Sequence, residues 1–287
     1  MNARRSRMSG VLAPLILLGT LNLLVFRDPM LDIFRTATKR PEGLYVLMVP
    51  LLAVYLAWLR QSRLGRYEIR RSFAGPVLIL SGWLLFVGGA FYDVVLFWHL
   101  GGIVGFIGVV VTCVGPRILL VFGPAFLVLF AIAPLPGVVR EWIALPLQNF
   151  ATIVTSIILE LLGVDAVRRG SIIEINGKIV LVGEACNGMR LVMPIALVIY
   201  AVVFSLPLRR AARFLLLFAS IPVALVCNIL RLIPTSLAYG FVPGSAEMVH
   251  DIGGWLMLPI AVLLLLGLLR FVEWLDVSVS KWRLVTA

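Results

Sequence analysis

The chain has 287 residues, of which 61% are hydrophobic and only 14% are charged, and its formal net charge is +11. A chain this apolar cannot hide its hydrophobic side chains inside a water-soluble globule, so composition excludes a soluble protein and indicates a polytopic membrane protein. The positive charge does not indicate nucleic acid, because most of it lies in short loops between apolar runs, where membrane topology explains it.

Apolar runs that approach the roughly 20 residues of a spanning helix recur along the whole chain. The first follows Arg4, Arg5 and Arg7 and resembles a signal peptide, but no small-residue cleavage site follows it, so we interpret it as a retained anchor. The predicted spans cover about residues 10–26, 44–59, 76–97, 100–115, 118–134, 187–204, 213–239 and 253–274.

Residues 142–162 are ambiguous, because polar side chains dilute a segment that is barely long enough to span. We expect an interfacial or re-entrant helix there, since the positive-inside rule places the arginines at 209, 210 and 213 in the cytoplasm only if this segment does not cross. The same rule places the basic loop at 60–71 inside. We therefore expect a plasma (inner) membrane protein with both termini cytoplasmic, although the charged segment 27–43, placed outside, weakens the bias.

The one convincing β signal is a hairpin, in which residues 171–175 and 178–182 flank Asn176 and Gly177. Asn-Gly between β-branched runs is a strong hairpin cue, because both turn positions need a positive φ. The expected fold is thus all-α, with about eight transmembrane helices, one extracytoplasmic β-hairpin and an interfacial helix. We expect one integral membrane domain over 1–287, with a catalytic core at about 165–260.

Three reactive side chains are expected at the outer face of the membrane. Arg231 lies 18 residues after Arg213, about 27 Å along a helix that rises from the cytoplasm. Cys186 begins a helix that descends from the outer face, and His250 precedes another by three residues. Thiol, imidazole and guanidinium are the groups that acyl transfer by a thiolate requires, as nucleophile, acid or base, and oxyanion partner.

Neighbouring polar residues support this interpretation. Asp251 is placed to orient His250, and Asn228 shares a helix face with Arg231. Cys186 is flanked by further candidate substrate-binding or supporting residues, Glu184, Asn187, Gly188 and Arg190. A cysteine in a membrane helix is usually a small packing residue, and we interpret Cys113 and Cys227 in that way. His99, beside Trp98, is expected to be an interfacial residue rather than a catalyst.

The three cysteines are widely spaced and match neither a disulfide framework nor a metal-ligand pattern. No metal or other cofactor is expected.

Three segments together resemble the exosortase/archaeosortase family of membrane cysteine transpeptidases. They are Arg-Gly-Ser-Ile-Ile-Glu-Ile at 169–175, Glu-Ala-Cys-Asn-Gly-Met-Arg at 184–190 and Cys-Asn-Ile-Leu-Arg at 227–231, and His250 before the last span favours the exosortase branch. Asn187 stands where serine is commoner in the family. The resemblance implies that Cys186 is the nucleophile, Arg231 the transition-state stabiliser and His250 the acid/base.

The resemblance also implies the substrates. These would be secreted proteins with a C-terminal sorting tail made of a short motif such as Pro-Glu-Pro, an apolar span and a basic cluster. The enzyme would cut near the motif through a thioester and transfer the protein to an unknown surface acceptor. The hairpin at 171–182 is expected either to hold the motif by adding a strand or to act as a structural lid.

Two alternatives remain from the residues alone. A transporter or channel would also have about eight spans and intramembrane polar residues such as Asn228 and Arg231, but the spans show no inverted halves. A rhomboid-like or metal-dependent intramembrane protease would require Gly-x-Ser-x-Gly or His-Glu-x-x-His, and the sequence has neither.

Overall fold

The computed structural model describes residues 2–39, 43–64, 72–133, 137–181 and 189–274, and for 2–11, 64, 140, 181, 189–191 and 272–273 it describes the backbone alone. The chain divides into two compact units, of which the first extends to Pro136 and the second begins at Gly137. The prediction of a single domain stays a prediction.

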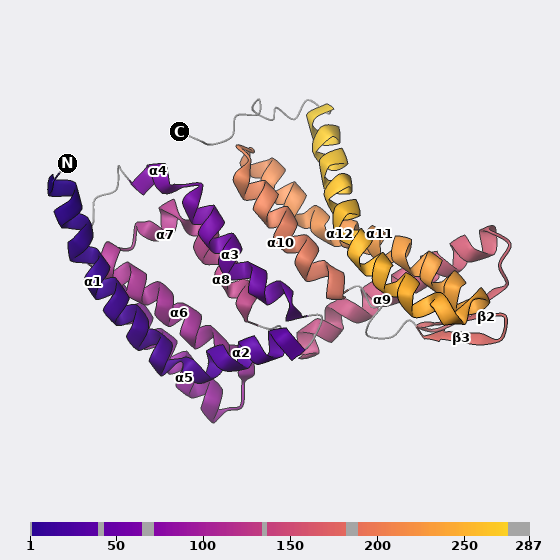
Figure 1. Ribbon diagram of the computed structural model, residues 1–287, viewed down its shortest axis with the longest axis horizontal. Helices are drawn as coiled ribbons and strands as arrows, with labels where there is room; N and C mark the ends of the chain where they lie inside the picture. Colours follow the sequence, from indigo (N-terminus) through magenta and orange to yellow (C-terminus); the bar gives the residue numbers. More distant parts are fainter. Residues whose placement is uncertain (1, 40–42, 65–71, 134–136, 182–188, 275–287) are drawn as a thin grey trace. The chain divides into compact units, whose positions relative to one another are not determined.

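The first unit is helical throughout its described part (Figure 1). Its helices are α1 (Asn2–Val25), α2 (Arg27–Lys39), α3 (Tyr45–Trp58), α4 (Gln61–Leu64), α5 (Ala74–Phe91), α6 (Val95–Val114), α7 (Ile118–Val121), α8 (Gly123–Leu129) and the 3₁₀ turn η2 (Phe130–Ile132). The fifth predicted span is therefore broken into three short pieces. The third and fourth spans were predicted at about 76–97 and 100–115, which puts their connecting loop too late in the chain. In the structure this loop covers residues 92–94, with Asp93 at a φ of 55°.

Glycines allow α5 and α6 to pack closely. Gly75, Gly82 and Gly89 recur every seven residues and are all buried. A Cβ atom on Gly82 would lie 2.6 Å from the backbone nitrogen of Gly105 on α6, so no larger residue fits there without a shift. Small residues at a helix interface are a common device in membranes, because they let two backbones approach.

The segment expected as an outer loop at 27–43 is largely the helix α2, which is bent by 71° from α1. Asp32 of this helix contacts His99 of α6, with 3.0 Å between Oδ2 of Asp32 and Nε2 of His99. His99 is 1% exposed. The expectation of an interfacial histidine is therefore wrong, because tertiary packing gives His99 a carboxylate partner inside the unit.

The second unit contains α9 (Gly137–Leu161), β1 (Ala166–Arg169), β2 (Ile172–Ile175), β3 (Lys178–Leu181), α10 (Met189–Ser205), α11 (Arg210–Phe241) and α12 (Pro243–Trp274). The three strands form one antiparallel sheet in the order β1-β2-β3. The predicted hairpin is confirmed as β2 and β3, and its turn has positive φ at both Asn176 (51°) and Gly177 (70°). The strand β1 was not predicted.

The sheet lies against α9 and the end of α11 (Figure 1). Its inner face contributes buried side chains from all three strands to a cluster shared with those helices: Ala166, Ile173, Ile175 and Val180 with Ala151, Leu159, Ile229 and Leu232. The helix approaches the sheet closely at Gly240, since a Cβ there would lie 2.5 Å from Cγ2 of Ile175.

Five helices are long and apolar enough to cross a membrane, or six if the bent pair α1 and α2 counts as one span. Shorter apolar helices cover three further predicted spans: Tyr45–Trp58, Gly123–Ile132 and Val192–Ser205. The fold class is confirmed as a mostly helical membrane protein with a small antiparallel sheet.

The ambiguous segment at 142–162 belongs to α9, a helix of 25 residues without a break. The expectation of an interfacial or re-entrant helix stays a prediction. By length and composition α9 is a candidate span.

Candidate active site

The candidate site is built on the helical hairpin formed by α11 and α12. Only Val242 separates the two helices, so residues equally far from the turn lie side by side. Arg231 is ten residues before the end of α11 and Gly253 is ten residues after the start of α12. A Cβ on Gly253 would lie 3.1 Å from Cγ of Arg231, which places this pair in direct contact. Fourteen residues from the turn, the Cys227 thiol lies 3.8 Å from the carbonyl oxygen of Met257.

Arg231 and Asn228 lie where α11 passes from one apolar cluster to another. Towards the start of α11, the helix packs with α10 and α12 through residues that include Leu216, Ala224 and Cys227. Beyond Asn228, it packs with α9 and the sheet through Ile229 and Leu232. The polar pair therefore lies between two hydrophobic layers.

Both members of this pair are 1% exposed. The guanidinium Nη2 of Arg231 donates to Oδ1 of Asn228 at 3.4 Å. One turn later, the hydroxyl of Thr235 donates to the carbonyl oxygen of Arg231 at 2.8 Å. A buried cation is costly to desolvate, and the bond to Asn228 reduces that cost, whereas the Thr235 bond goes to the backbone of Arg231 and not to its guanidinium.

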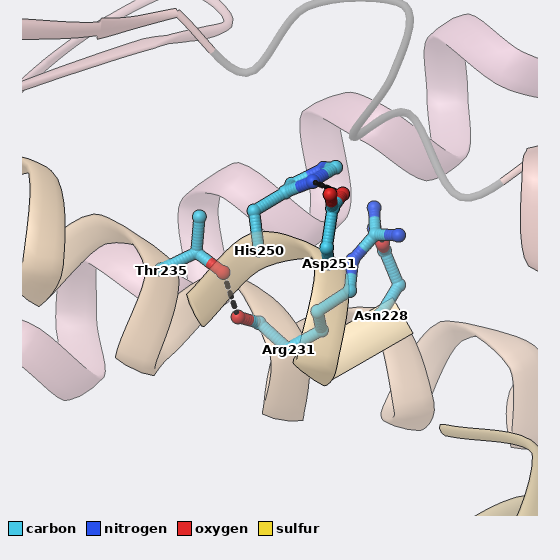
Figure 2. A network of polar contacts seen from close by, with 5 residues as sticks. All are labelled: Asn228, Arg231, Thr235, His250 and Asp251. Carbon is cyan, nitrogen blue, oxygen red and sulfur yellow. Dashed lines mark hydrogen bonds and ion pairs between the residues drawn. The ribbon is translucent and has the colours of Figure 1, made fainter. Parts of the chain in front are cut away.

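His250 and Asp251 lie on α12, and Figure 2 shows them on the helix next to Arg231 and Asn228. Nδ1 of His250 lies 3.1 Å from Oδ1 of Asp251. The His250 side chain is 14% exposed and that of Asp251 is 67% exposed. Nε2 of His250 is buried and has no hydrogen-bond partner among the described residues. The carboxylate thus contacts Nδ1, which leaves Nε2 as the ring nitrogen for any proton transfer.

The helix that carries His250 begins earlier than predicted. The expected start was residue 253, whereas α12 begins at Pro243, so His250 lies two turns inside the helix. Proline is well suited to the first position of a helix, and Ala246, Glu247 and Met248 are good helix formers. His250 is three residues nearer the turn than Gly253, about 4.5 Å along the axis from the level of Arg231.

Four predicted site residues, Glu184, Cys186, Asn187 and Gly188, lie outside the described residues. Arg190 is in the first turn of α10, where only the backbone is described. The described chain leaves the sheet at Leu181 and resumes at Met189, so the Cys186 segment joins β3 to α10. Cys113 and Cys227 are buried at 7% and 0% exposure, as expected for packing residues.

Sequence reasoning missed Gly253 and Thr235. The signal for Gly253 was present, since a glycine inside an apolar helix often marks a close approach. Its partner depends on the register of the hairpin, which the late predicted start of α12 obscured. Within the described part of the chain, no three His, Cys, Asp or Glu side chains are grouped so that they would hold a metal ion.

These features define a polytopic membrane protein with a buried arginine–asparagine pair and a histidine–aspartate pair on adjoining helices. The model of the transmembrane exosortase family matches residues 39–267, most of the chain. The chain therefore belongs to the transmembrane exosortase family. No curated protein and no solved structure matches it.

Family membership makes the chain a membrane protein-sorting enzyme, whose substrates are proteins with sorting signals. The family is generally regarded as one of membrane cysteine proteases or transpeptidases. This assignment favours an enzyme over the transporter or channel alternative.

Proposed function

We propose that this exosortase cleaves the C-terminal sorting tail of secreted proteins at the outer face of the plasma membrane and transfers them to a surface acceptor. Cys186 is the nucleophile, His250 the acid/base and Arg231 the oxyanion partner. The observation that carries the proposal is the arrangement of His250, which contacts Asp251 through Nδ1 and has its Nε2 buried, with no partner among the described residues, beside the arginine-bearing helix.

The first half-reaction forms a thioester. His250 takes the proton of the Cys186 thiol, and the thiolate sulfur attacks the carbonyl carbon of the scissile peptide bond. The carbonyl electron pair moves to the oxygen. As the tetrahedral intermediate collapses, the C–N bond breaks and His250 gives its proton to the departing amine. The membrane tail leaves, and the secreted part remains bound to Cys186.

The second half-reaction reverses these roles. A nucleophile of the acceptor gives its proton to His250 and attacks the thioester carbonyl, the C–S bond breaks, and His250 returns the proton to the sulfur of Cys186. With an amine as acceptor the product is a new amide, whereas water would give the free carboxylic acid.

Arg231 provides the positive charge that the developing oxyanion requires. Its guanidinium is bonded to Asn228 and buried between two apolar clusters, where a charge interacts more strongly than in water. It stays protonated throughout, so it cannot act as the base. We assign Glu184, Asn187, Gly188 and Arg190, which flank Cys186, to binding and supporting the substrate.

The proposal is tested by replacing each cysteine in turn. A secreted reporter ending in Pro-Glu-Pro, an apolar span and an arginine cluster is co-expressed with the full-length enzyme, and its cleavage is followed by immunoblot. Cys186→Ala should abolish cleavage, since alanine has no nucleophile. Cys113→Ala and Cys227→Ala should retain it, because those thiols are buried packing residues.

A second measurement isolates the intermediate. Intact-protein mass spectrometry of the wild-type enzyme after mixing with reporter should reveal an adduct that hydroxylamine removes, as a thioester requires. Cleavage by Cys186→Ala at the wild-type rate would contradict the proposal.

A further inference from the structure

We propose that the free edge of β3 binds the segment of the substrate next to the scissile bond, as a fourth strand of the sheet. This inference rests on the proposed function, because it takes the substrate to be an extended peptide that ends in a membrane span. It adds a binding subsite formed by backbone groups at Ile179 and Leu181.

The sheet has two edges, since β2 lies between β1 and β3. A strand at an edge presents N–H and C=O groups on the side that lacks a neighbour, and an extended peptide can pair with them. In the described part of the chain, β3 pairs with β2 alone.

The register identifies the groups that point outwards. Ile175 and Lys178 flank the two-residue turn, and in such a hairpin the flanking pair exchanges both ladder hydrogen bonds. Bonded and non-bonded pairs alternate along an antiparallel ladder. Val180 therefore also bonds to β2, whereas the backbone groups of Ile179 and Leu181 point away from it.

The other edge is less suited to a substrate. On β1 the same alternation directs the backbone of Arg168 outwards. The Arg168 guanidinium donates to the carbonyl oxygen of Gly170 at 2.9 Å and lies 3.5 Å from Oδ1 of Asn149 on α9. This side chain ties the β1 edge to the loop and the neighbouring helix.

The β3 edge is continuous with the proposed active site. The chain runs from β3 directly into the segment that contains Cys186. The sheet is seated on α11 through Ile175 and Gly240, and Gly240 is nine residues beyond Arg231, about 14 Å along the axis. A peptide of five extended residues covers about 16 Å, which is enough to reach from the sheet to the level of the guanidinium.

The exposed face of the sheet also suits a peptide. Val167 and Ile179 are 47% and 66% exposed, and the ion pair between Arg169 and Glu174 lies on the same face. An added strand would lie about 4.8 Å from β3, so every second side chain would lie on the face of Ile179 and the one opposite would contact it. The occupant is thus an extended peptide with small or apolar side chains on that face.

Proline substitutions at the two edges test the inference with the reporter described above. Ile179→Pro removes one outward N–H and no ladder bond, and edge strands tolerate proline at such positions. We expect cleavage about tenfold slower, the effect of one lost backbone hydrogen bond at the upper end of its range. Arg168→Pro also removes an outward N–H, on the opposite edge, together with the side-chain bonds of Arg168 to Gly170 and Asn149, and should leave the cleavage rate unchanged. Ile179→Ala removes side-chain contact alone and should slow cleavage no more than about twofold.

Both proline variants are first compared with wild type for expression and thermal unfolding in detergent. Equal cleavage by folded Ile179→Pro and Arg168→Pro would overturn the inference.

Cross-linking separates this inference from the choice of nucleophile. In the Cys186→Ala protein, p-benzoylphenylalanine replaces either Ile179 or Arg168, and the co-expressed reporter is irradiated in membranes. We expect at least fivefold more enzyme–reporter adduct from position 179, mapped by mass spectrometry to the Pro-Glu-Pro segment.

The outcomes of this experiment are distinct. Cleavage that persists in Cys186→Ala would remove the proposed nucleophile, while an adduct from position 179 would still support the β3 edge. Where wild type cleaves the reporter, the lack of an adduct from position 179, or equal adduct from both positions, would overturn the edge inference alone.

Discussion

Arg231 is a buried cation held by a residue on its own helix. The spacing of three residues between Asn228 and Arg231 puts the amide oxygen of Asn228 next to the guanidinium. The hydrogen bond of 3.4 Å between them orients the planar guanidinium group. Arginine differs from lysine here, because a planar guanidinium can bind Asn228 and an oxyanion at the same time, whereas an ammonium on a flexible stem is a point charge. The chemistry therefore depends on the shape of this group as well as its charge.

The Arg231→Lys variant should cleave the reporter about 100-fold more slowly, in the range measured when one oxyanion-hole donor is removed. Charge and approximate length are kept, so the variant should still insert and fold. Arg270→Lys, which changes an exposed residue of α12, is the matched control and should retain the wild-type rate. A rate for Arg231→Lys within twofold of wild type would remove Arg231 from the proposed mechanism.

At the scale of elements, the α11–α12 hairpin determines which side chains meet. Its one-residue connection pairs Arg231 with Gly253 and Cys227 with Met257. The absence of a side chain on Gly253 leaves the space that the Arg231 stem occupies. A larger residue there must displace the guanidinium, the helix or both, and overpacking of this kind costs about 1–3 kcal/mol.

Gly253 and its neighbour Gly254 allow a matched test of this contact. A Cβ on Gly254 has nothing within 4 Å among the described residues, whereas one on Gly253 meets Arg231. Gly253→Val should reduce reporter cleavage at least tenfold and lower the thermal stability of the detergent-solubilised protein. Gly254→Val makes the same change in helix propensity and should remain near wild type in both assays. Similar losses in the two variants would show that the α11–α12 contact does not govern activity.

For the whole molecule, the question is which segments cross the membrane. The 25-residue α9 is about 37 Å long, enough to span, while residues 118–132 are broken into α7, α8 and η2. The predicted topology counts 118–134 as a crossing and leaves out 142–162. If α9 crosses instead of the broken segment, the number of crossings before the sheet is unchanged. The charge argument then still places the sheet outside and the basic loop inside.

Cysteine labelling tests this topology. In a background in which Cys113, Cys186 and Cys227 are alanine, single cysteines replace Arg63, Gly137 or Arg169, and intact cells are treated with a membrane-impermeant maleimide. We expect labelling of Arg169→Cys in intact cells, and labelling of Arg63→Cys and Gly137→Cys only after permeabilisation. Labelling of Gly137→Cys in intact cells would mean that α9 lies along the membrane surface.

The sequence by itself determined the membrane class, the β2–β3 hairpin and the motif residues of the candidate site. Those features are local, because apolar run length, the Asn176–Gly177 turn and the Asn228–Arg231 spacing each depend on a few neighbouring residues. Membership of the exosortase family follows from the same motifs and is confirmed.

Only the tertiary structure decided the long-range features. The strand β1 is too short and too polar to predict alone, and it forms because β2 offers an edge above α9. The pairing of His99 with Asp32 joins residues 67 positions apart. The contact between Arg231 and Gly253 depends on a helix that begins at Pro243, ten residues earlier than its hydropathy indicates. Packing between helices places these side chains together, and no local pattern records which faces will meet.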